Sequence, residues 1–187
     1  MKEYTPKIPK KITPRYLENV ALYYLQRYAS SSQNLKAVLM RRAVKSCRHH
    51  DMPLIDAEMM IDQMIQKYEN VKILDDQKYC EQIITSLRQR GFSKQAIINK
   101  LKMKKLSTLQ INDALSHFDQ ENADQNIEWE SALKFAKKRK LGAFRTKETS
   151  DKKTQDLKDI AKLARAGFSY DICQKIIKLD ESTLGDF

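Results

Sequence analysis

Apolar residues recur along most of the chain at the spacing of an α-helix. Leu17, Val20, Ala21, Tyr24 and Leu25 stand at positions i, i+3, i+4, i+7 and i+8, which places them on one helix face. The same spacing returns in eight further segments. The nine apolar faces cover residues 17–28, 35–43, 57–68, 79–87, 97–101, 111–118, 129–136, 157–164 and 172–179. The pattern therefore predicts nine short helices.

Residues with capping preferences stand at several of the predicted helix ends. Thr13 followed by Pro14 is a typical helix start, with the threonine as N-cap and the proline in the first turn. Ser107 and Gln110 have the spacing of a capping box. Gly91 suits the left-handed position that ends a helix. These residues predict where individual helices begin and end.

The predicted helices fall into three groups of three, because three short helices can close a small core whereas two cannot. Residues 25–39 can be laid over residues 87–101 with their apolar positions aligned, and the Gly-Phe-Ser of residues 91–93 recurs at residues 167–169. We expect tandem three-helix repeats that form an elongated, curved array. The expected parts are a flexible basic arm at 1–12 and three-helix units at 13–72, 73–120 and 126–187, the last with a mobile loop at 145–154.

Composition also favours an all-helical protein. The 187 residues include only four glycines and four prolines, which is few for the many turns of a sheet protein. No apolar run reaches about 18 residues, so we expect no transmembrane helix, and the basic N-terminus lacks the apolar stretch of a secretory signal. Three widely spaced cysteines make a poor disulfide framework, which favours a reducing cytoplasm.

The net charge of +11 indicates a polyanionic partner such as nucleic acid. The charge is also segregated along the chain. Residues 30–50, 88–105 and 134–147 contain basic residues and no acidic ones, whereas residues 106–133 contain six acidic residues and neither lysine nor arginine. Each basic cluster could be an ordinary solvated surface. If the predicted units stack, the clusters form a continuous basic groove whose binding to phosphates weakens with salt.

No arrangement of residues is typical of an active site. The chain lacks the glycine-rich loop of P-loop ATPases and the Gly-x-Ser-x-Gly motif. Cys47 with His49 or His50 provides at most half of a zinc site, so we expect a surface histidine pair near a helix end. Asp75 and Asp76 precede an apolar run, as helix-capping residues do. We expect no enzymatic activity, no metal and no cofactor.

Three phenylalanines near the basic clusters, Phe92, Phe135 and Phe144, are candidates for stacking on nucleic-acid bases. Phe92 and Phe168 each follow a glycine. This repetition favours a core role for both of them over a binding role.

The central segment resembles a known family. Residues 73–81 read Ile-Leu-Asp-Asp-Gln-Lys-Tyr-Cys-Glu, and residues 86–101 read Ser-Leu-Arg-Gln-Arg-Gly-Phe-Ser-Lys-Gln-Ala-Ile-Ile-Asn-Lys-Leu. Together they resemble the central signature of the RecX family of bacterial recombination regulators. Residues 129–133 and 164–172 resemble the start and the closing corner of that family's third unit. The resemblance therefore spans most of the chain.

The resemblance implies three tandem three-helix units and a function in DNA recombination, DNA repair and the SOS response. It implies a monomeric or weakly associated protein, not bound to membranes, that binds the RecA recombinase, preferably as a filament on single-stranded DNA. Family members typically lower the ATPase, strand-exchange and co-protease activities of that filament and have no catalytic activity of their own. The alternative is a general helical DNA- or RNA-binding module that acts without RecA.

The candidate contacts to the filament or its nucleic acid are basic residues of the three clusters. Four of them match the central signature by position, and three follow the tryptophan of the third unit. The full candidate set is Arg88, Arg90, Lys94, Lys100, Lys102, Lys104, Lys105, Lys134, Lys137, Lys138, Arg139, Arg41 and Arg42.

Overall fold

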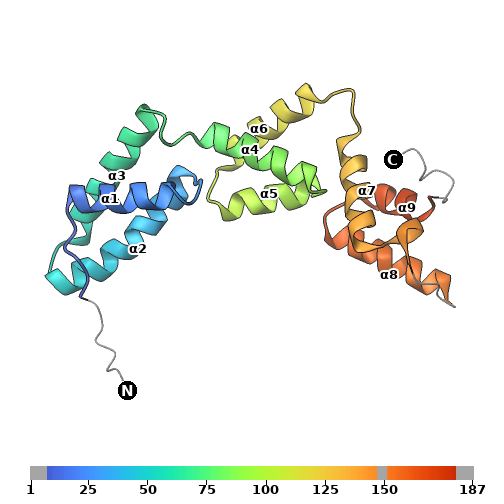
Figure 1. Ribbon diagram of the computed structural model, residues 1–187, viewed down its shortest axis with the longest axis horizontal. Helices are drawn as coiled ribbons and strands as arrows, with labels where there is room; N and C mark the ends of the chain where they lie inside the picture. Colours follow the sequence, from blue (N-terminus) through green and yellow to red (C-terminus); the bar gives the residue numbers. More distant parts are fainter. Residues whose placement is uncertain (1–7, 147–150, 180–187) are drawn as a thin grey trace, which may run out of the picture. The chain divides into compact units, whose positions relative to one another are not determined.

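The structure, a computed structural model, describes residues 8–146 and 151–179. These residues form nine α-helices and one short 3-10 helix, with no strand (Figure 1). The all-helical fold predicted from the apolar spacing is confirmed. In chain order the elements are α1 (Pro14–Leu25), α2 (Ser32–His50), α3 (Leu54–Asn70), α4 (Asp76–Gln89), α5 (Lys94–Met103), α6 (Thr108–Glu121), α7 (Ile127–Arg139), η1 (Gly142–Phe144), α8 (Lys152–Arg165) and α9 (Tyr170–Ile177).

The predicted caps form at the helix ends. The Thr13 hydroxyl accepts a hydrogen bond from the Tyr16 N–H, and Pro14 is the first residue of α1. Ser107 and Gln110 make the reciprocal pair of bonds of a capping box at the start of α6. Such side-chain bonds satisfy N–H groups that the first turn of a helix leaves without a partner. They explain why the helices begin where the sequence predicts.

The described residues divide into two compact units. The first contains the chain up to Tyr79 together with Lys104–Leu106, and the second contains Cys80–Met103 and the chain from Ser107 onward. Two of the three predicted groups, α4–α6 and α7–α9, thus lie mainly in the second unit. The division into three tandem repeats, and the array that they would form, stay predictions.

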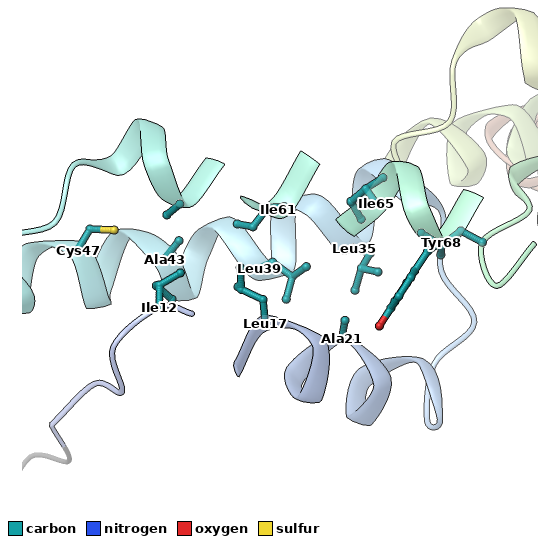
Figure 2. Packing of buried hydrophobic residues seen from close by; sticks show 12 residues of the cluster. Ile12, Leu17, Ala21, Leu35, Leu39, Ala43, Cys47, Ile61, Ile65 and Tyr68 are labelled. Atoms are coloured by element: carbon teal, nitrogen blue, oxygen red, sulfur yellow. The ribbon is translucent and has the colours of Figure 1, made fainter. Parts of the chain in front are cut away.

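The core of the first unit lies between α1, α2 and α3. Figure 2 shows the apolar side chains of the three helices pointing toward one another. Burying one such side chain fully contributes about 1.5–3 kcal/mol, so this cluster stabilises the unit. The cluster includes Ile12, Leu17, Ala21, Leu35, Leu39, Ala43, Ile61, Ile65 and Tyr68.

The segment just before α1 is attached to α2. The Ser46 hydroxyl donates to the carbonyl of Lys10 at 2.8 Å, and the His50 ring bonds to the carbonyl of Pro9 through Nε2 at 2.7 Å. Ile12 is only 2% exposed and joins the core. Residues 9–12 of the expected flexible arm therefore pack against the first unit, because their carbonyls find donors on α2. Residues 1–7 lie outside the described residues.

In the second unit, α7, α8 and α9 surround a core of their own. Its buried side chains are Ala132, Leu133, Ala136, Leu141, Leu163, Phe168, Cys173 and Ile176. The helices α4, α5 and α6 contribute further buried residues to this unit. Those that expose at most 7% of their surface include Ile84, Leu87, Ile97, Leu101, Ile111 and Leu115.

The repeated Gly-Phe-Ser sequence forms two helix–turn–helix corners in the second unit. Gly91 and Gly167 both have positive φ angles, 79° and 91°, which glycine adopts without a steric penalty. The two corners approach each other closely, since the Ser93 hydroxyl donates to the Ala166 carbonyl at 2.6 Å. A Cβ atom added at Gly167 would lie 2.6 Å from the Ser93 hydroxyl. The repetition therefore marks positions where the chain needs glycine for both conformation and space.

Part of the mobile loop expected at residues 145–154 belongs to a helix. α8 begins at Lys152, because the Asp151 side chain accepts a hydrogen bond from the Thr154 N–H and caps the helix. At the other end, the guanidinium of Arg145 binds the carboxylates of Asp156 and Asp159 at 2.6 and 2.7 Å. Both ends of the expected loop are thus ordered by polar contacts that apolar spacing does not reveal. Residues 147–150 lie outside the described residues.

Cys47, Cys80 and Cys173 are buried thiols. Cys80 and Cys173 therefore occupy the core positions that the apolar spacing predicts. Among the described residues, each helix is too short or too polar to span a lipid bilayer.

Candidate nucleic-acid interface

Arg88, in the last turn of α4, lies inside the second unit. Only 5% of its side chain is exposed. Its Nη1 atom lies 2.5 Å from Oε2 of Glu128 and donates to the carbonyl of Phe92 at 3.3 Å. The structure thus places Arg88 where it connects α4 to α7, not on the exposed surface where we expected a ligand contact.

Glu128, in the first turn of α7, is a functional partner that the sequence analysis missed. Besides binding Arg88, its two carboxylate oxygens accept the backbone N–H of Lys94 at 3.1 and 3.2 Å. A carboxylate is favoured at this position, because the N-terminus of a helix carries partial positive charge. The sequence does contain one signal that Arg88 is buried and needs an acidic partner. Arg88 follows Ile84 by four residues and so continues the buried face of α4.

The other expected residues of the second unit have exposed side chains. Two of them form ion pairs, Lys94 with Asp119 at 2.6 Å and Lys134 with Glu130 at 3.8 Å. Both pairs are solvent-exposed, and pairs of this kind contribute little to stability. The remaining cations have no acidic partner within the described part of the chain, and they are Arg90, Lys100, Lys102, Lys137, Lys138 and Arg139.

Four expected residues belong to the first unit. Arg41 and Arg42 lie side by side in sequence on α2, and Lys104 and Lys105 follow α5. All four side chains are exposed. The carbonyl of Lys104 accepts a hydrogen bond from the Ser31 hydroxyl, which holds this segment to the start of α2. The continuous basic groove expected along the repeats stays a prediction.

Two half-buried phenylalanine rings lie among the exposed cations of the second unit. Lys100 Nζ and Arg90 Cζ lie 4.9 and 5.4 Å from the centre of the Phe92 ring. Arg139 Cζ lies 5.9 Å from the centre of the Phe135 ring. Cations within about 6 Å of an aromatic face are attracted by its negative charge density. The structure therefore brings basic and aromatic candidates together in one unit.

The third aromatic candidate, Phe144, packs in η1 against the α7–α9 core. Phe168 is 4% exposed, so its predicted core role is confirmed. Its ring packs at 5.7 Å against that of Phe135 and supports it from the core side. Phe92 is half-buried and lines a pocket, so the core role predicted for it stays a prediction.

This pocket lies between the corner before α5, helix α7 and the end of α8. Its volume is about 430 Å³, within the range of about 300–1,000 Å³ that is typical of ligand sites. None of its lining residues is acidic, and three are basic. The lining consists of Gly91, Phe92, Ser93, Ala96, Phe135, Arg139, Lys162, Arg165, Ala166 and Phe168.

A buried carboxylate, Asp159, holds one of the cations that line the pocket. It accepts hydrogen bonds from Lys162 Nζ at 3.1 Å, from Arg145 Nε at 2.7 Å and from the Gly142 N–H at 3.2 Å. Burial alone would raise the pKa of Asp159. The bonds from Arg145, Lys162 and Gly142 outweigh burial and lower this pKa below its ordinary value. Asp159 is therefore charged at neutral pH and orients Lys162 at the edge of the pocket.

The histidines near Cys47 occupy the end of α2. The rings of His49 and His50 meet edge to face at 4.8 Å, and His50 bonds to the Pro9 carbonyl. Across the described residues, no group of three or more His, Cys, Asp or Glu side chains is placed to hold a metal ion.

The two aspartates at the start of α4, Asp75 before the helix and Asp76 as its first residue, act as helix caps. Asp75 accepts the backbone N–H of Lys78 at 3.1 Å, as predicted for a cap of its own helix. Asp76 accepts the backbone N–H of Ser32 at 2.7 Å and thus caps α2. Sequence spacing does not reveal this second contact, because the two residues lie 44 positions apart.

The fold and the site define an all-helical protein whose second unit exposes cations around a phenylalanine-lined pocket. The fold is shared with a crystal structure of a regulatory protein RecX, with a TM-score of 0.62 over 87% of this chain and 72% of that chain, at 21% sequence identity. The regulatory protein RecX of Myxococcus xanthus (strain DK1622) is 35% identical over 180 residues, which cover 94% of this chain and 91% of the relative. No family model matches the chain. This chain belongs to the RecX family of regulatory proteins.

Proposed function

We propose that this protein binds the RecA recombinase and its filament on single-stranded DNA, and that it inhibits the recombinase, ATPase and co-protease activities of that filament. The observation that supports this most is the 35% identity to a regulatory protein RecX over 94% of the chain. Because the match covers nearly the full length of both proteins, it relates the whole chain to the regulator, and not only one segment of the chain.

The charge of the molecule is consistent with such a partner. A filament on DNA carries the phosphates of the nucleic acid, and the chain has a net charge of +11. Cations that neutralise phosphates release condensed counterions, which favours binding at low salt. The exposed cations of the second unit are the contacts that we propose, and Arg88 is a positioning residue for them because it connects α4 to α7.

Occupation of the filament surface would slow filament growth without any chemical step in this protein. Inhibition would then appear when the protein is present at a small fraction of the RecA concentration. Sequestration of RecA monomers would require nearly equal amounts. The ratio of the two proteins at half-inhibition therefore distinguishes the two mechanisms.

The test is ATP hydrolysis by the cognate RecA on single-stranded DNA, with this protein titrated in below the RecA concentration. We expect inhibition by the wild type and weaker inhibition by Lys100→Glu with Arg139→Glu. The matched control is Lys153→Glu with Lys158→Glu, which reverses two exposed charges on α8 away from the pocket lining. No inhibition by the wild type, together with salt-sensitive binding to bare DNA, would favour a helical nucleic-acid-binding module that acts without RecA.

A further inference from the structure

We propose that the pocket of the second unit binds one nucleotide of single-stranded DNA, with the base against Phe92 and Phe135 and a backbone phosphate at Arg139 and Arg165. This inference rests on the proposed function and specifies the ligand group that the site recognises.

The aromatic walls of the pocket come from two different helical segments. Phe92 lies in the corner before α5 and Phe135 lies in α7, and both rings are half-buried. The Phe135 ring is supported from behind by Phe168, with ring centres 5.7 Å apart. A ring that is already held in place loses little freedom when a base stacks on it, and every nucleobase has a flat face that can do so.

The cations at the pocket are held by contacts that leave them able to bind phosphate. Arg165 donates from Nε to the Ala161 carbonyl at 3.1 Å, and this is the one hydrogen bond of its side chain within the described residues. Arg139 lies 5.9 Å from the Phe135 ring and forms no ion pair in that part of the chain. An arginine side chain has five N–H donors in a planar fork that fits a phosphate. Both arginines therefore present donors beside the aromatic walls.

The combination of rings and cations favours a nucleotide over an acidic peptide. An acidic side chain would bind the cations and leave the phenylalanine rings without a matching partner. A nucleotide supplies both a negative charge and a flat apolar face within one small group. The pocket volume of about 430 Å³ also exceeds what a single carboxylate needs.

The test compares two strands and a double variant by fluorescence anisotropy with this protein alone. One strand is a short labelled oligothymidylate, and the other has the same length and charge but lacks bases. We expect the wild type to bind the base-free strand about tenfold more weakly, as loss of base stacking predicts. We expect Phe92→Leu with Phe135→Leu to bind oligothymidylate about tenfold more weakly and to lose the preference for it.

Two controls separate stacking from charge and from folding. Tyr170→Leu removes an exposed aromatic ring of the same unit that does not line the pocket, and it should bind both strands as the wild type does. Arg139→Ala should weaken binding to both strands alike, because each has phosphates. Leucine keeps the apolar volume of phenylalanine largely intact, and an unchanged melting temperature will show that the double variant is folded.

Equal binding of the two strands by the wild type would overturn the inference, as would wild-type binding of oligothymidylate by a folded double variant. If that variant binds DNA normally but no longer inhibits RecA, the pocket takes a protein segment and the inference is also wrong. RecA inhibition by the wild type in that experiment would leave the proposed function standing. Loss of base preference in the double variant without any RecA inhibition by the wild type would support the pocket and contradict the proposed function.

Discussion

Neighbouring basic side chains of this protein differ in role, although they belong to one cluster in the sequence. Some are buried in ion pairs and others are exposed. Arg88 and Arg90 are two residues apart, yet Arg88 is buried against Glu128 and Arg90 is exposed beside Phe92. The difference follows from helical geometry, because Arg90 directly follows α4, its N–H still bonds to the Ser86 carbonyl, and two residues along a helix turn the side chain by more than half a circle. A basic cluster in a sequence therefore mixes structural ion pairs with surface contacts.

Replacing Arg88 tests its structural role. Arg88→Ala leaves the half-buried carboxylate of Glu128 without its cation, and removal of one partner from a buried pair costs about 3 kcal/mol. We expect urea denaturation of the full chain to show a loss of that size in the free energy of unfolding. Arg90→Ala is the matched control and should change this free energy by less than about 0.5 kcal/mol. Equal stability of the two variants would contradict the role of Arg88.

Asp159 makes the stability of the second unit depend on acid. Its pKa is lower in the folded chain than in the unfolded chain, so the unfolded chain binds the proton more tightly. The stabilisation is therefore present above about pH 4, where an unfolded aspartate titrates, and is lost as the pH falls through the lower folded pKa.

The measurement is thermal unfolding as a function of pH. The wild type should lose stability as the pH falls below about 4. Asp159→Asn should be less stable than the wild type at neutral pH, since Arg145 and Lys162 lose their anion. Its melting temperature should also fall less steeply in acid. An identical acid dependence of both proteins would show that other carboxylates dominate.

At the scale of the helices, individual residues determine where each helix begins and ends. Thr13, Ser31, Ser107 and Ser169 cap four helices through side-chain oxygens, and the sequence marks all of them by residue type. The C-terminal ends are less regular. Gly91 and Gly167 adopt the left-handed conformation that suits glycine, but a lysine does so after α7.

Lys140 is a place where the sequence departs from the preferred residue. It ends α7 with φ 56° and ψ 52°, a left-handed conformation that costs a residue with a Cβ about 1 kcal/mol. Lys140→Gly should therefore raise the free energy of unfolding by about 0.5–1 kcal/mol. Differential scanning calorimetry should show a higher melting temperature.

The control for this prediction replaces a glycine that has a left-handed conformation at another helix end. Gly91→Ala introduces a Cβ atom at φ 79°, 2.9 Å from Lys134 Cβ and 3.0 Å from the Ser131 carbonyl. It should lower the melting temperature. A fall in the melting temperature of Lys140→Gly would mean that the lysine side chain contributes more than its backbone conformation costs.

At the scale of the whole molecule, charge is distributed unevenly between segments. The acidic residues of the stretch at 106–133 supply partners for cations of the second unit: Asp119 pairs with Lys94, Glu128 with Arg88 and Glu130 with Lys134. Acidic and basic segments that are separate in the sequence are thus partly paired in the folded second unit. Among the expected cations of the second unit that have no acidic partner in the described residues, Arg90 and Lys100 lie beside Phe92 and Arg139 lies beside Phe135.

Binding to single-stranded DNA should accordingly be sensitive to salt. If about four phosphates are neutralised, the logarithm of the association constant falls with a slope near −3 against the logarithm of salt concentration. Affinity should then decrease by roughly 10- to 100-fold between about 50 and 200 mM salt. Titration of the full chain with an oligothymidylate over this range measures the slope. Binding that does not respond to salt would contradict a phosphate-binding surface.

The sequence by itself determined the helical fold, the number of helices in the described residues and most of their starting points. It could do so because apolar periodicity and capping are local properties, set by residues within one or two turns of one another. The resemblance to the RecX family also depended on short contiguous motifs, such as residues 86–101, and the comparison with the Myxococcus relative confirms it.

Only the tertiary structure decided which residues share a site. Arg88 and Glu128 lie 40 positions apart, and Ser93 and Ala166 lie 73 apart. The pocket joins the corner before α5 to α7 and α8, and the attachment of residues 9–12 to α2 likewise depends on distant residues. Such contacts arise from how helices pack, and helix packing depends on the side chains of all partners at once. No single segment of the sequence contains that information.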